Sequence, residues 1–414
     1  MKHKKTTPIS TAHNNLVKIS PSSQAQGHYD FIDGFRAIAM IMILTHHIRR
    51  GFNLDNIFEN DPPLLKRIFY TAWDVFKINL TQFFVGIQHI IVNMKGILGV
   101  EMFLVISGFL ITKILLRGPL TKDFVFRFYQ RRFFRIYPVY FLVVMLSLGV
   151  YAWQNQQNLY VVAVAALQHL FFLQNYFPLH PFLSHTWTLV VLEQYYFFCP
   201  LIILAVNRFV PERNRRKTLI GICLSLIAIS PLIRIYCLKT GQPLITWPFS
   251  SPTPYWTILH NLGPLCLGCL LALLEPYWSL IKKNIFWGIV YWGIGAALVY
   301  YLYFCLDWSY YWGPWYLYTL GYLSTGLLLF AAYHGISVFA NLKSFQWLGR
   351  NSYGIYIWHF LILELWKPWY GTVIPPALAI IGCFVTSIIA GVLSTRTVES
   401  YFLSLREKRC PRMN

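Results

Sequence analysis

The sequence contains little charge, and acidic residues are especially scarce. Only 12% of the 414 residues are charged, with 15 Asp and Glu against 35 Lys and Arg. Hydrophobic residues make up 56%, and the mean hydropathy is +0.48, values that exclude an ordinary soluble domain. We therefore expect an integral membrane protein in contact with the lipid bilayer.

The sequence also lacks the patterns of a disulfide-rich, metal-binding or secreted protein. Its eight cysteines are scattered and lie mostly within apolar segments, where they read as small buried residues. Cys266 and Cys269 have CxxC spacing without a second pair, so no metal site is predicted. No secretory signal peptide is expected, because the first apolar run contains Asp33 and Arg36.

Apolar runs of roughly 20 residues, long enough to cross a bilayer, recur along the chain. Lys and Arg gather in the loops between them, which favours a role in setting topology over nucleic-acid binding. Because such loops stay in the cytoplasm, we predict an all-α polytopic membrane protein with about ten transmembrane helices and both termini cytoplasmic. The predicted spans are 31–48, 97–116, 136–153, 187–207, 218–237, 256–275, 285–304, 315–334, 352–367 and 372–393.

The spans define one transmembrane domain, 31–394, between basic cytoplasmic tails at 1–30 and 395–414. Residues 159–177 could form an eleventh span, but the cytoplasmic loops on either side require an even number of crossings between them. This run is therefore predicted to be interfacial or re-entrant. The 49–96 connection is assigned outside, where its semi-apolar sequence could form amphipathic or re-entrant helices.

The first span contains the stretch "DGFRAIAMIMILTHH", with four ionisable side chains at bilayer depth. Such groups are costly there and usually face a functional cavity. Arg36 and His47 would lie roughly 16 Å apart along a helix, with the arginine toward the cytoplasm and the histidine toward the exterior. Asp33 and His46 accompany them at the two ends.

The second span places Glu101 near its outer end and Ser107 deeper. A basic loop at 117–135 follows, and Pro138 is expected to mark the start of the next helix. Four arginines in this region either satisfy the positive-inside rule or form a phosphate clamp, since guanidinium groups suit phosphate oxygens. They are Arg127, Arg131, Arg132 and Arg135.

Polar residues also mark the later spans. His185 and Trp187 are placed at the outer interface, and Glu193 lies about two turns inside the helix. His359 is placed in mid-membrane, where a histidine is either a hydrogen-bonded structural residue or a catalyst. The polar groups thus sort by depth, which suggests entry of a phosphorylated donor from inside and a reaction near the outer face. A histidine beside a carboxylate suits proton removal from a hydroxyl.

Five motifs together resemble the acyltransferase 3 family of bacterial membrane acyltransferases. They are "DGFRAIAMIMILTHH", "GVEMFLVISGFLIT", "RRFFRIYP", "SHTWTLVVLEQYYF" and "LGRNSYGIYIWH", in the family's order. The family's essential pair, an Arg and a His with ten residues between them, corresponds to Arg36 and His47. Glu101 replaces the usual Asp, Leu192 stands where a Glu is usual, and 49–96 is longer than is typical.

The resemblance implies O-acylation, most often O-acetylation, of a hydroxyl on lipopolysaccharide, capsule or another exopolysaccharide. The donor would be cytoplasmic acyl-CoA, chiefly acetyl-CoA, with its phosphates on the arginine cluster and no metal required. His47 would act at the acceptor hydroxyl as a general base or by briefly carrying the acyl group. Arg36 would be its partner, and Glu101 or Glu193 an orienting carboxylate.

A protein of this kind would reside in the bacterial inner membrane, with a surface or lipid-linked glycan as acceptor. Two other classes of function remain open from the sequence. A transporter or flippase also lines its pathway with intramembrane Arg, His and Glu, although the chain shows no internal repeat. A glycan-assembly scaffold would use the basic loops only for topology.

Overall fold

The computed structural model describes residues 29–53, 96–118, 120–176, 181–240, 256–278, 283–302 and 315–410. These residues are almost entirely helical and form no β-strand, which confirms the predicted all-α class for this part of the chain. Most of the 49–96 connection and of the N-terminal tail 1–30 lies outside the described residues.

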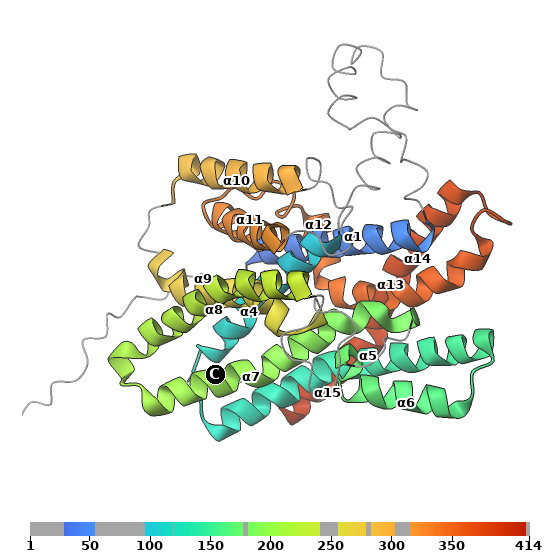
Figure 1. The fold of residues 1–414 in the computed structure, drawn as a ribbon, viewed down its shortest axis with the longest axis horizontal. Helices are drawn as coiled ribbons and strands as arrows, with labels where there is room; N and C mark the ends of the chain where they lie inside the picture. The colour runs from blue at the N-terminus through green and yellow to red at the C-terminus, as the bar shows by residue number, and fades with distance from the viewer. Residues whose placement is uncertain are drawn as a thin grey trace, which may run out of the picture.

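Each apolar run predicted from the sequence coincides for most of its length with a helix (Figure 1). The α-helices are α1 (Asp30–Gly51), α4 (Gly96–Leu115), α5 (Lys122–Asn155), α6 (Leu159–Leu170), α7 (Trp187–Phe209), α8 (Glu212–Thr240), α9 (Leu262–Trp278), α10 (Ile285–Tyr300), α11 (Trp315–Tyr333), α12 (Lys343–Arg350), α13 (Ser352–Trp366), α14 (Pro376–Ser394) and α15 (Ser400–Arg409).

Seven helices in the described part of the chain are long and apolar enough to cross a membrane. They are α1, α4, α5, α7, α8, α9 and the continuous rod that contains α14 and α15. The runs predicted at 285–304, 315–334 and 352–367 form α10, α11 and α13, which do not belong to this set. The membrane character is therefore supported, while about ten spans and cytoplasmic termini remain predictions.

The predicted interfacial or re-entrant run at 159–177 forms α6, which has 12 residues. At 1.5 Å per residue this helix is about 18 Å long, well short of the ~30 Å hydrocarbon core. Its length therefore fits the prediction that this run does not cross the membrane by itself.

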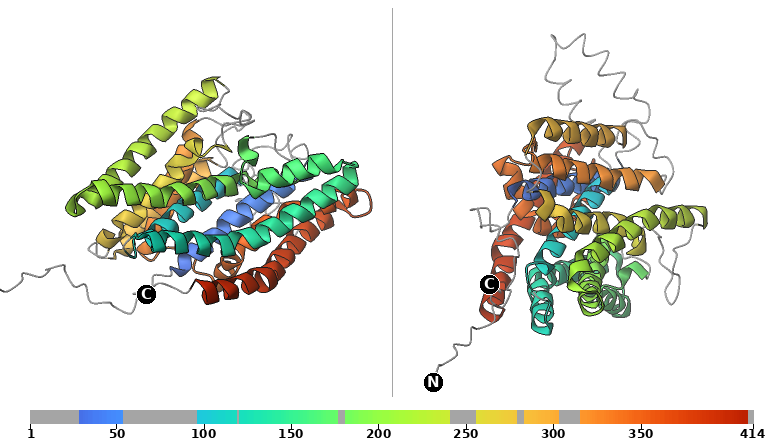
Figure 2. Two further views of the ribbon diagram at one scale, coloured as in Figure 1. Left: turned by 90° about the horizontal axis from the view of Figure 1, so that it is seen from below. Right: turned by 90° about the vertical axis from the view of Figure 1, so that its left-hand side faces the viewer.

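Helix α1 lies inside the bundle in both views of Figure 2. It packs against α4, α12 and α13, and α4 in turn packs along α9. The α4–α9 pair approaches closely because two glycines face each other's backbones. A Cβ atom at Gly108 would lie 2.2 Å from the Leu265 carbonyl oxygen, and one at Gly268 would lie 2.1 Å from that of Val105. Only glycine permits this helix contact.

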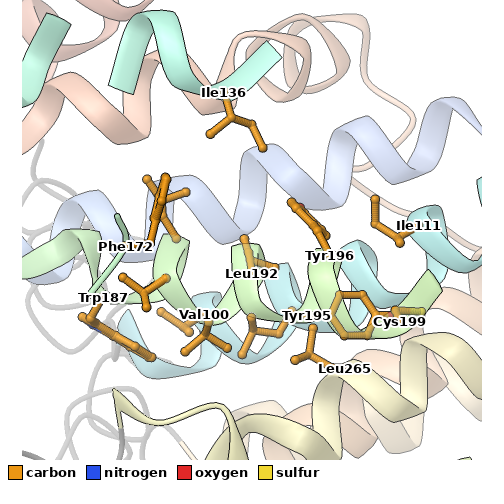
Figure 3. Packing of buried hydrophobic residues seen from close by; sticks show 14 of the residues in the cluster. Val100, Ile111, Ile136, Phe172, Trp187, Leu192, Tyr195, Tyr196, Cys199 and Leu265 are labelled. Atoms are coloured by element: carbon orange, nitrogen blue, oxygen red, sulfur yellow. The ribbon is translucent and has the colours of Figure 1, made fainter. Parts of the chain in front are cut away.

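The largest apolar core joins α4, α5, α7 and α9 (Figure 3). Figure 3 shows Leu192, Tyr195 and Tyr196 along α7, with Val100 of α4 and Leu265 of α9 beside them. Leu192 is buried in this core. An apolar side chain therefore occupies the position at which the family usually has a glutamate.

Helix α5 is continuous through Pro138, so the prediction that this proline starts a new helix is wrong. The helix begins earlier, where the Thr121 hydroxyl accepts a hydrogen bond from the Phe124 N–H. Proline is tolerated inside membrane helices because neighbouring groups satisfy the backbone oxygen that it leaves unpaired. The basic residues before Pro138 thus belong to the same rigid element as the apolar span after it.

A hydrogen-bonded chain links α5 to the segment before α7. The Gln174 side-chain amide donates to the Tyr140 hydroxyl at 3.0 Å and to the Thr186 hydroxyl at 3.2 Å. All three side chains are buried, where such bonds are costly to lose. This chain fixes the position of the residue that precedes Thr186, His185.

The predicted C-terminal tail at 395–414 is helical as far as Arg409. A π-helical turn, Thr395–Glu399, joins α14 to α15, and α15 packs on α5. Arg131 of α5 forms an ion pair with Glu407 at 2.8 Å and also donates to the Cys410 carbonyl. Residues 395–410 of this segment therefore pack against the bundle.

Glu101 and Arg234 form an ion pair at 3.3 Å, and both side chains are fully buried. The Arg234 guanidinium also donates to the His260 carbonyl at 3.0 Å and lies 4.8 Å from the centre of the Tyr318 ring. The pair joins α4 to α8. Removal of either side chain alone would leave the other as an uncompensated charge in the interior.

We expect Arg234→Met to destabilise the protein by about 3 kcal/mol, because Glu101 would remain buried without its partner. Thermal unfolding of purified protein in detergent measures the loss. The double variant Glu101→Leu/Arg234→Met removes both charges and is expected to recover much of it. A double variant as unstable as the single one would show that the charges themselves are not responsible.

Candidate active site

Two cavities lie at opposite ends of α1, and the polar residues predicted from the sequence divide between them. The histidine cavity has a volume of about 450 Å³ and the arginine cavity about 600 Å³. The histidine cavity is lined by residues that include Ile43, His46, His47, Arg50, His185, Trp187, Thr188, Trp256, Tyr318, Tyr356 and Phe360. The arginine cavity is lined by residues that include Asp33, Arg36, Phe103, Ser107, Arg132, Arg135, Glu193, Arg350, Tyr353 and Glu399.

His47 forms a hydrogen bond with His359, with 2.8 Å between His47 Nδ1 and His359 Nε2. The other nitrogen of His359, Nδ1, lies 2.5 Å from the Tyr356 carbonyl oxygen. A carbonyl can only accept, so His359 Nδ1 carries the proton and, in the neutral ring, Nε2 accepts from His47. Neutral His47 is then protonated at Nδ1, and its Nε2 keeps the lone pair that a base requires.

Tyr356 also fixes the neighbouring residues of the histidine cavity. Its hydroxyl donates to the His185 carbonyl oxygen at 2.5 Å. Because that hydroxyl has only one proton, the contact with the Thr188 hydroxyl, also 2.5 Å, is one in which Thr188 donates. Tyr356 thus holds His185 through its side chain and His359 through its backbone.

Two tryptophans line the histidine cavity and are held by one buried side chain. The Asn175 amide donates to the Trp187 carbonyl at 2.9 Å and to the Trp256 carbonyl at 2.7 Å. Asn175 thus ties together the backbone at the two tryptophans, whose rings give the cavity aromatic surfaces beside a few polar groups, the usual lining of a small-molecule site.

The arginine cavity is strongly basic. Six basic side chains line it, against three acidic ones. Arg36 pairs with Asp33 at 3.4 Å, while Arg132 lies over the Tyr196 ring, 5.2 Å from its centre. Because guanidinium groups match phosphate oxygens in charge and geometry, this cavity suits a phosphorylated ligand. The basic residues are Arg36, Lys113, Arg117, Arg132, Arg135 and Arg350.

Comparison with known proteins identifies the scaffold that carries these cavities. A family model described as an acyltransferase domain, that of acyltransferase 3, matches residues 29–396. The chain belongs to the acyltransferase 3 family. The match includes every described helix from α1 to α14, and with them both cavities.

Three curated relatives of this acyltransferase are named as O-acetyltransferases. The O-acetyltransferase OatA of Staphylococcus aureus is 29% identical over 74% of this chain and 52% of its own length. The putative peptidoglycan O-acetyltransferase YrhL of Bacillus subtilis is 25% identical over 81% of this chain and 49% of its own length. The peptidoglycan O-acetyltransferase OatA of Listeria monocytogenes is 25% identical over 66% of this chain and 46% of its own length.

This acyltransferase thus spans about half the length of the curated relatives that it matches. No solved structure matches it.

The acyltransferase keeps Arg36 and His47 apart, as their spacing predicts. Arg36 lines the arginine cavity and His47 the histidine cavity. His46, His185 and Trp187 line the same cavity as His47. His359 is hydrogen-bonded to His47 but does not itself line the cavity. Arginine and histidine therefore lie at opposite ends of α1, and which end faces the cytoplasm remains a prediction.

The two predicted carboxylates do not lie beside His47. Glu101 pairs with Arg234 and is absent from the lining of either cavity, and Glu193 lines the arginine cavity instead. The group bonded to His47 is a second histidine, His359. A histidine can set the tautomer of its neighbour without adding a charge, which costs less in an apolar bundle.

Of the four arginines predicted to form a clamp, Arg132 and Arg135 line the arginine cavity. Arg131 is instead bound to Glu407, and Arg127 is exposed on the outside of α5. Arg132 and Arg135, three residues apart, share a helix face. Arg131 also neighbours Arg135 on the helix, but its ion pair with Glu407 holds it against α15.

Arg350 also lines the arginine cavity, and it comes from α12, which packs on α1. It ends α12, and Gly349 beside it allows that helix to touch α1, since a Cβ there would lie 1.7 Å from the Asp33 carbonyl oxygen. The motif "LGRNSYG" contains both Gly349 and Arg350, so the sequence did mark this segment as one of interest. Nothing in the sequence alone indicates which cavity this motif reaches.

The sequence reasoning also missed Asn175, Thr188 and Tyr356. Tyr356 precedes His359 by three residues, a spacing that places two side chains on one helix face. This spacing could have suggested that Tyr356 belongs to the same site as His359. Asn175 gives no comparable signal, because it acts on backbone atoms of distant segments.

We expect His359→Ala to lower the turnover number of this acyltransferase about 10- to 100-fold, with little change in KM. The variant removes the acceptor that keeps the proton of His47 on Nδ1, and mispositioned proton-transfer groups lose part of their contribution. Steady-state kinetics in membrane vesicles measures the effect. His334→Ala, which alters a histidine outside both cavities, is the control, and equal losses in both variants would contradict the role of His359.

Proposed function

We propose that this chain is an O-acyltransferase that moves an acyl group, chiefly acetyl, from cytoplasmic acyl-CoA to a hydroxyl of a cell-surface glycan. The observation that carries the proposal is the hydrogen-bonded His47–His359 pair at one end of α1, with six basic side chains around a cavity at the other. Family membership supports the acyl-transfer chemistry.

In the proposed reaction, the donor's phosphates bind in the arginine cavity and the acceptor sugar lies in the histidine cavity. The hydroxyl oxygen of the acceptor forms an ester bond to the acyl carbon as the carbon–sulfur bond of the thioester breaks. His47 Nε2 takes the hydroxyl proton and returns it to the departing sulfur, which leaves as the CoA thiol. The tryptophans Trp187 and Trp256 offer flat surfaces on which a sugar ring can pack.

The acceptor is proposed as a class, because several surface polymers share the necessary hydroxyl groups. The motif resemblance implies lipopolysaccharide O-antigen, capsule or exopolysaccharide, whereas two relatives are named for peptidoglycan. On this proposal the protein resides in the bacterial inner membrane, with the arginine cavity open to the cytoplasm.

Ester analysis of isolated surface polymers tests the proposal. Peptidoglycan, lipopolysaccharide and capsule are prepared separately from cells with and without the protein, and mild base releases ester-linked acyl groups for mass spectrometry. We expect one polymer to lose its ester when the protein is absent. Labelled acetyl-CoA supplied to inside-out vesicles should label the same polymer. Identical acylation of every polymer in both strains would contradict the proposal.

A further inference from the structure

The mouth of the histidine cavity carries positive charge. Of the described residues that line this cavity, Arg50 and Lys367 are the two that are exposed, so they stand where a ligand enters. No Asp or Glu belongs to the described lining, whereas three acidic residues line the arginine cavity. The histidine cavity therefore presents cations to a ligand but, among its described residues, no carboxylate.

Four helix ends meet at this cavity and nearly offset one another. Helices α1 and α13 end there, beside Gly51 and Lys367, and α4 and α7 begin there, at Gly96 and Trp187. The carboxyl end of a helix carries partial negative charge and the amino end partial positive charge. Because two ends of each kind are present, the side chains set the charge of the cavity.

Both cations are placed to hold a ligand close to His47. Arg50 follows His47 by three residues, so the two side chains share a face of α1 and lie about 4.5 Å apart along its axis. Lys367 donates a hydrogen bond to Glu364 at 2.5 Å, and Glu364 lies outside the cavity lining. An ammonium group has three N–H donors, so Lys367 can hold Glu364 and a ligand anion together.

A negative charge at this place would assist the proposed reaction. His47 becomes positively charged when it takes the proton of the hydroxyl, and Arg50 on the same helix face opposes that charge. The residue hydrogen-bonded to His47 is a second histidine, while Glu101 and Glu193 lie elsewhere. An anion on the substrate would stabilise the protonated His47, since opposite charges attract strongly where little water is present.

We propose that the acceptor is an acidic glycan, whose carboxylate or phosphate binds to Arg50 and Lys367 while its hydroxyl lies at His47. This inference rests on the proposed function and adds to it the charge of the acceptor. The carboxylate of an acidic sugar and the phosphate of a phosphodiester-linked polymer offer the same anionic oxygens to guanidinium and ammonium groups. A neutral glycan lacks this contact and is a poor acceptor.

Neutralised acceptors test the charge requirement. The polymer that loses its ester in cells without the protein is given to the full-length protein in detergent with acetyl-CoA. It is supplied intact, with its carboxyl groups converted to methylamides, or with its phosphates removed. We expect one treatment to lower kcat/KM for the polymer at least about 10-fold, because a hydrogen-bonded ion contact is lost. Loss after amidation assigns the carboxylate, and loss after phosphate removal assigns the phosphate.

Equal rates on all three preparations would overturn the inference and leave the proposed function standing. Absence of both ester and CoA thiol release with every preparation would instead refute the proposed function.

A double variant links the charge requirement to the two cations. Arg50→Gln/Lys367→Gln should lower kcat/KM for the intact polymer at least about 10-fold, with little further loss on the neutralised polymer, because the same contact is already absent. Arg49→Gln removes the same charge from the same turn of α1 but outside both cavities, and should stay close to wild type.

The KM for acetyl-CoA serves as the check on folding in these variants. It should remain at the wild-type value, since the arginine cavity is untouched. A folded double variant that acylates the intact polymer as fast as wild type would overturn the role of Arg50 and Lys367.

Discussion

Replacement of His47 by alanine is expected to lower glycan O-acylation by about 10³-fold at equal protein abundance. General acid–base catalysis contributes about 10²- to 10⁴-fold, and the variant removes the whole imidazole. The effect should fall on turnover rather than on donor binding, because His47 and the basic residues line different cavities. Mild-base release of acyl groups, followed by mass spectrometry and proton NMR of the glycan, measures the loss.

A control for this experiment is available within the same protein. His334 lines neither cavity, and its Nδ1 accepts a hydrogen bond from the Asn284 N–H at 3.2 Å. His334→Ala should therefore keep most of the wild-type acylation. If the His47→Ala variant acylated the glycan to within a few-fold of the wild-type level, His47 would have no part in the mechanism. The family to which the chain belongs would be unaffected by that result.

The double variant Arg132→Gln/Arg135→Gln is expected to raise the KM for acyl-CoA by about 10²-fold or more. Hydrogen bonds to charged groups contribute about 1.5–3 kcal/mol each, and 1.4 kcal/mol corresponds to a factor of ten. Turnover at saturating donor should change much less, since His47 is untouched. Initial rates in inside-out vesicles, measured across a range of acetyl-CoA concentrations, separate the two quantities.

Arg127→Gln supplies the matched control, because Arg127 lies on the same helix but is exposed outside the arginine cavity. Its KM should stay close to that of wild type. Equal effects of the control and the double variant would mean that the arginines act through general surface charge. Addition of salt should raise the wild-type KM, since it screens the attraction of accessible phosphates.

The sequence predicts well those features that depend on local pattern. Apolar runs locate the helices, and the spacing of Arg36 and His47 predicts that they act at different depths. Prediction from sequence fails where the residue that contacts a side chain comes from a distant segment of the chain. The carboxylate expected beside His47 is absent there, because Glu101 is paired with Arg234, a residue more than a hundred positions away within an otherwise apolar run.

Helix α5 shows a second limit of prediction from sequence. Proline and a basic cluster both indicate a helix boundary in an average protein, yet here a single helix carries them. Packing decides the outcome, since Val139 and Tyr140 directly after Pro138 are buried in the core. Sequence rules based on frequencies cannot include contacts that only the folded bundle provides.

The continuity of α5 has a mechanical meaning. A helix of 34 residues, about 51 Å long, behaves as a stiff rod whose parts move together. Arg135 on this rod borders one cavity, and Tyr140, little more than one turn further along, is bonded through Gln174 to Thr186, the neighbour of His185 in the other. A tilt imposed by a ligand on the arginines would therefore displace the support of His185. On the proposed function, the rod would couple donor binding at the arginines to the position of His185.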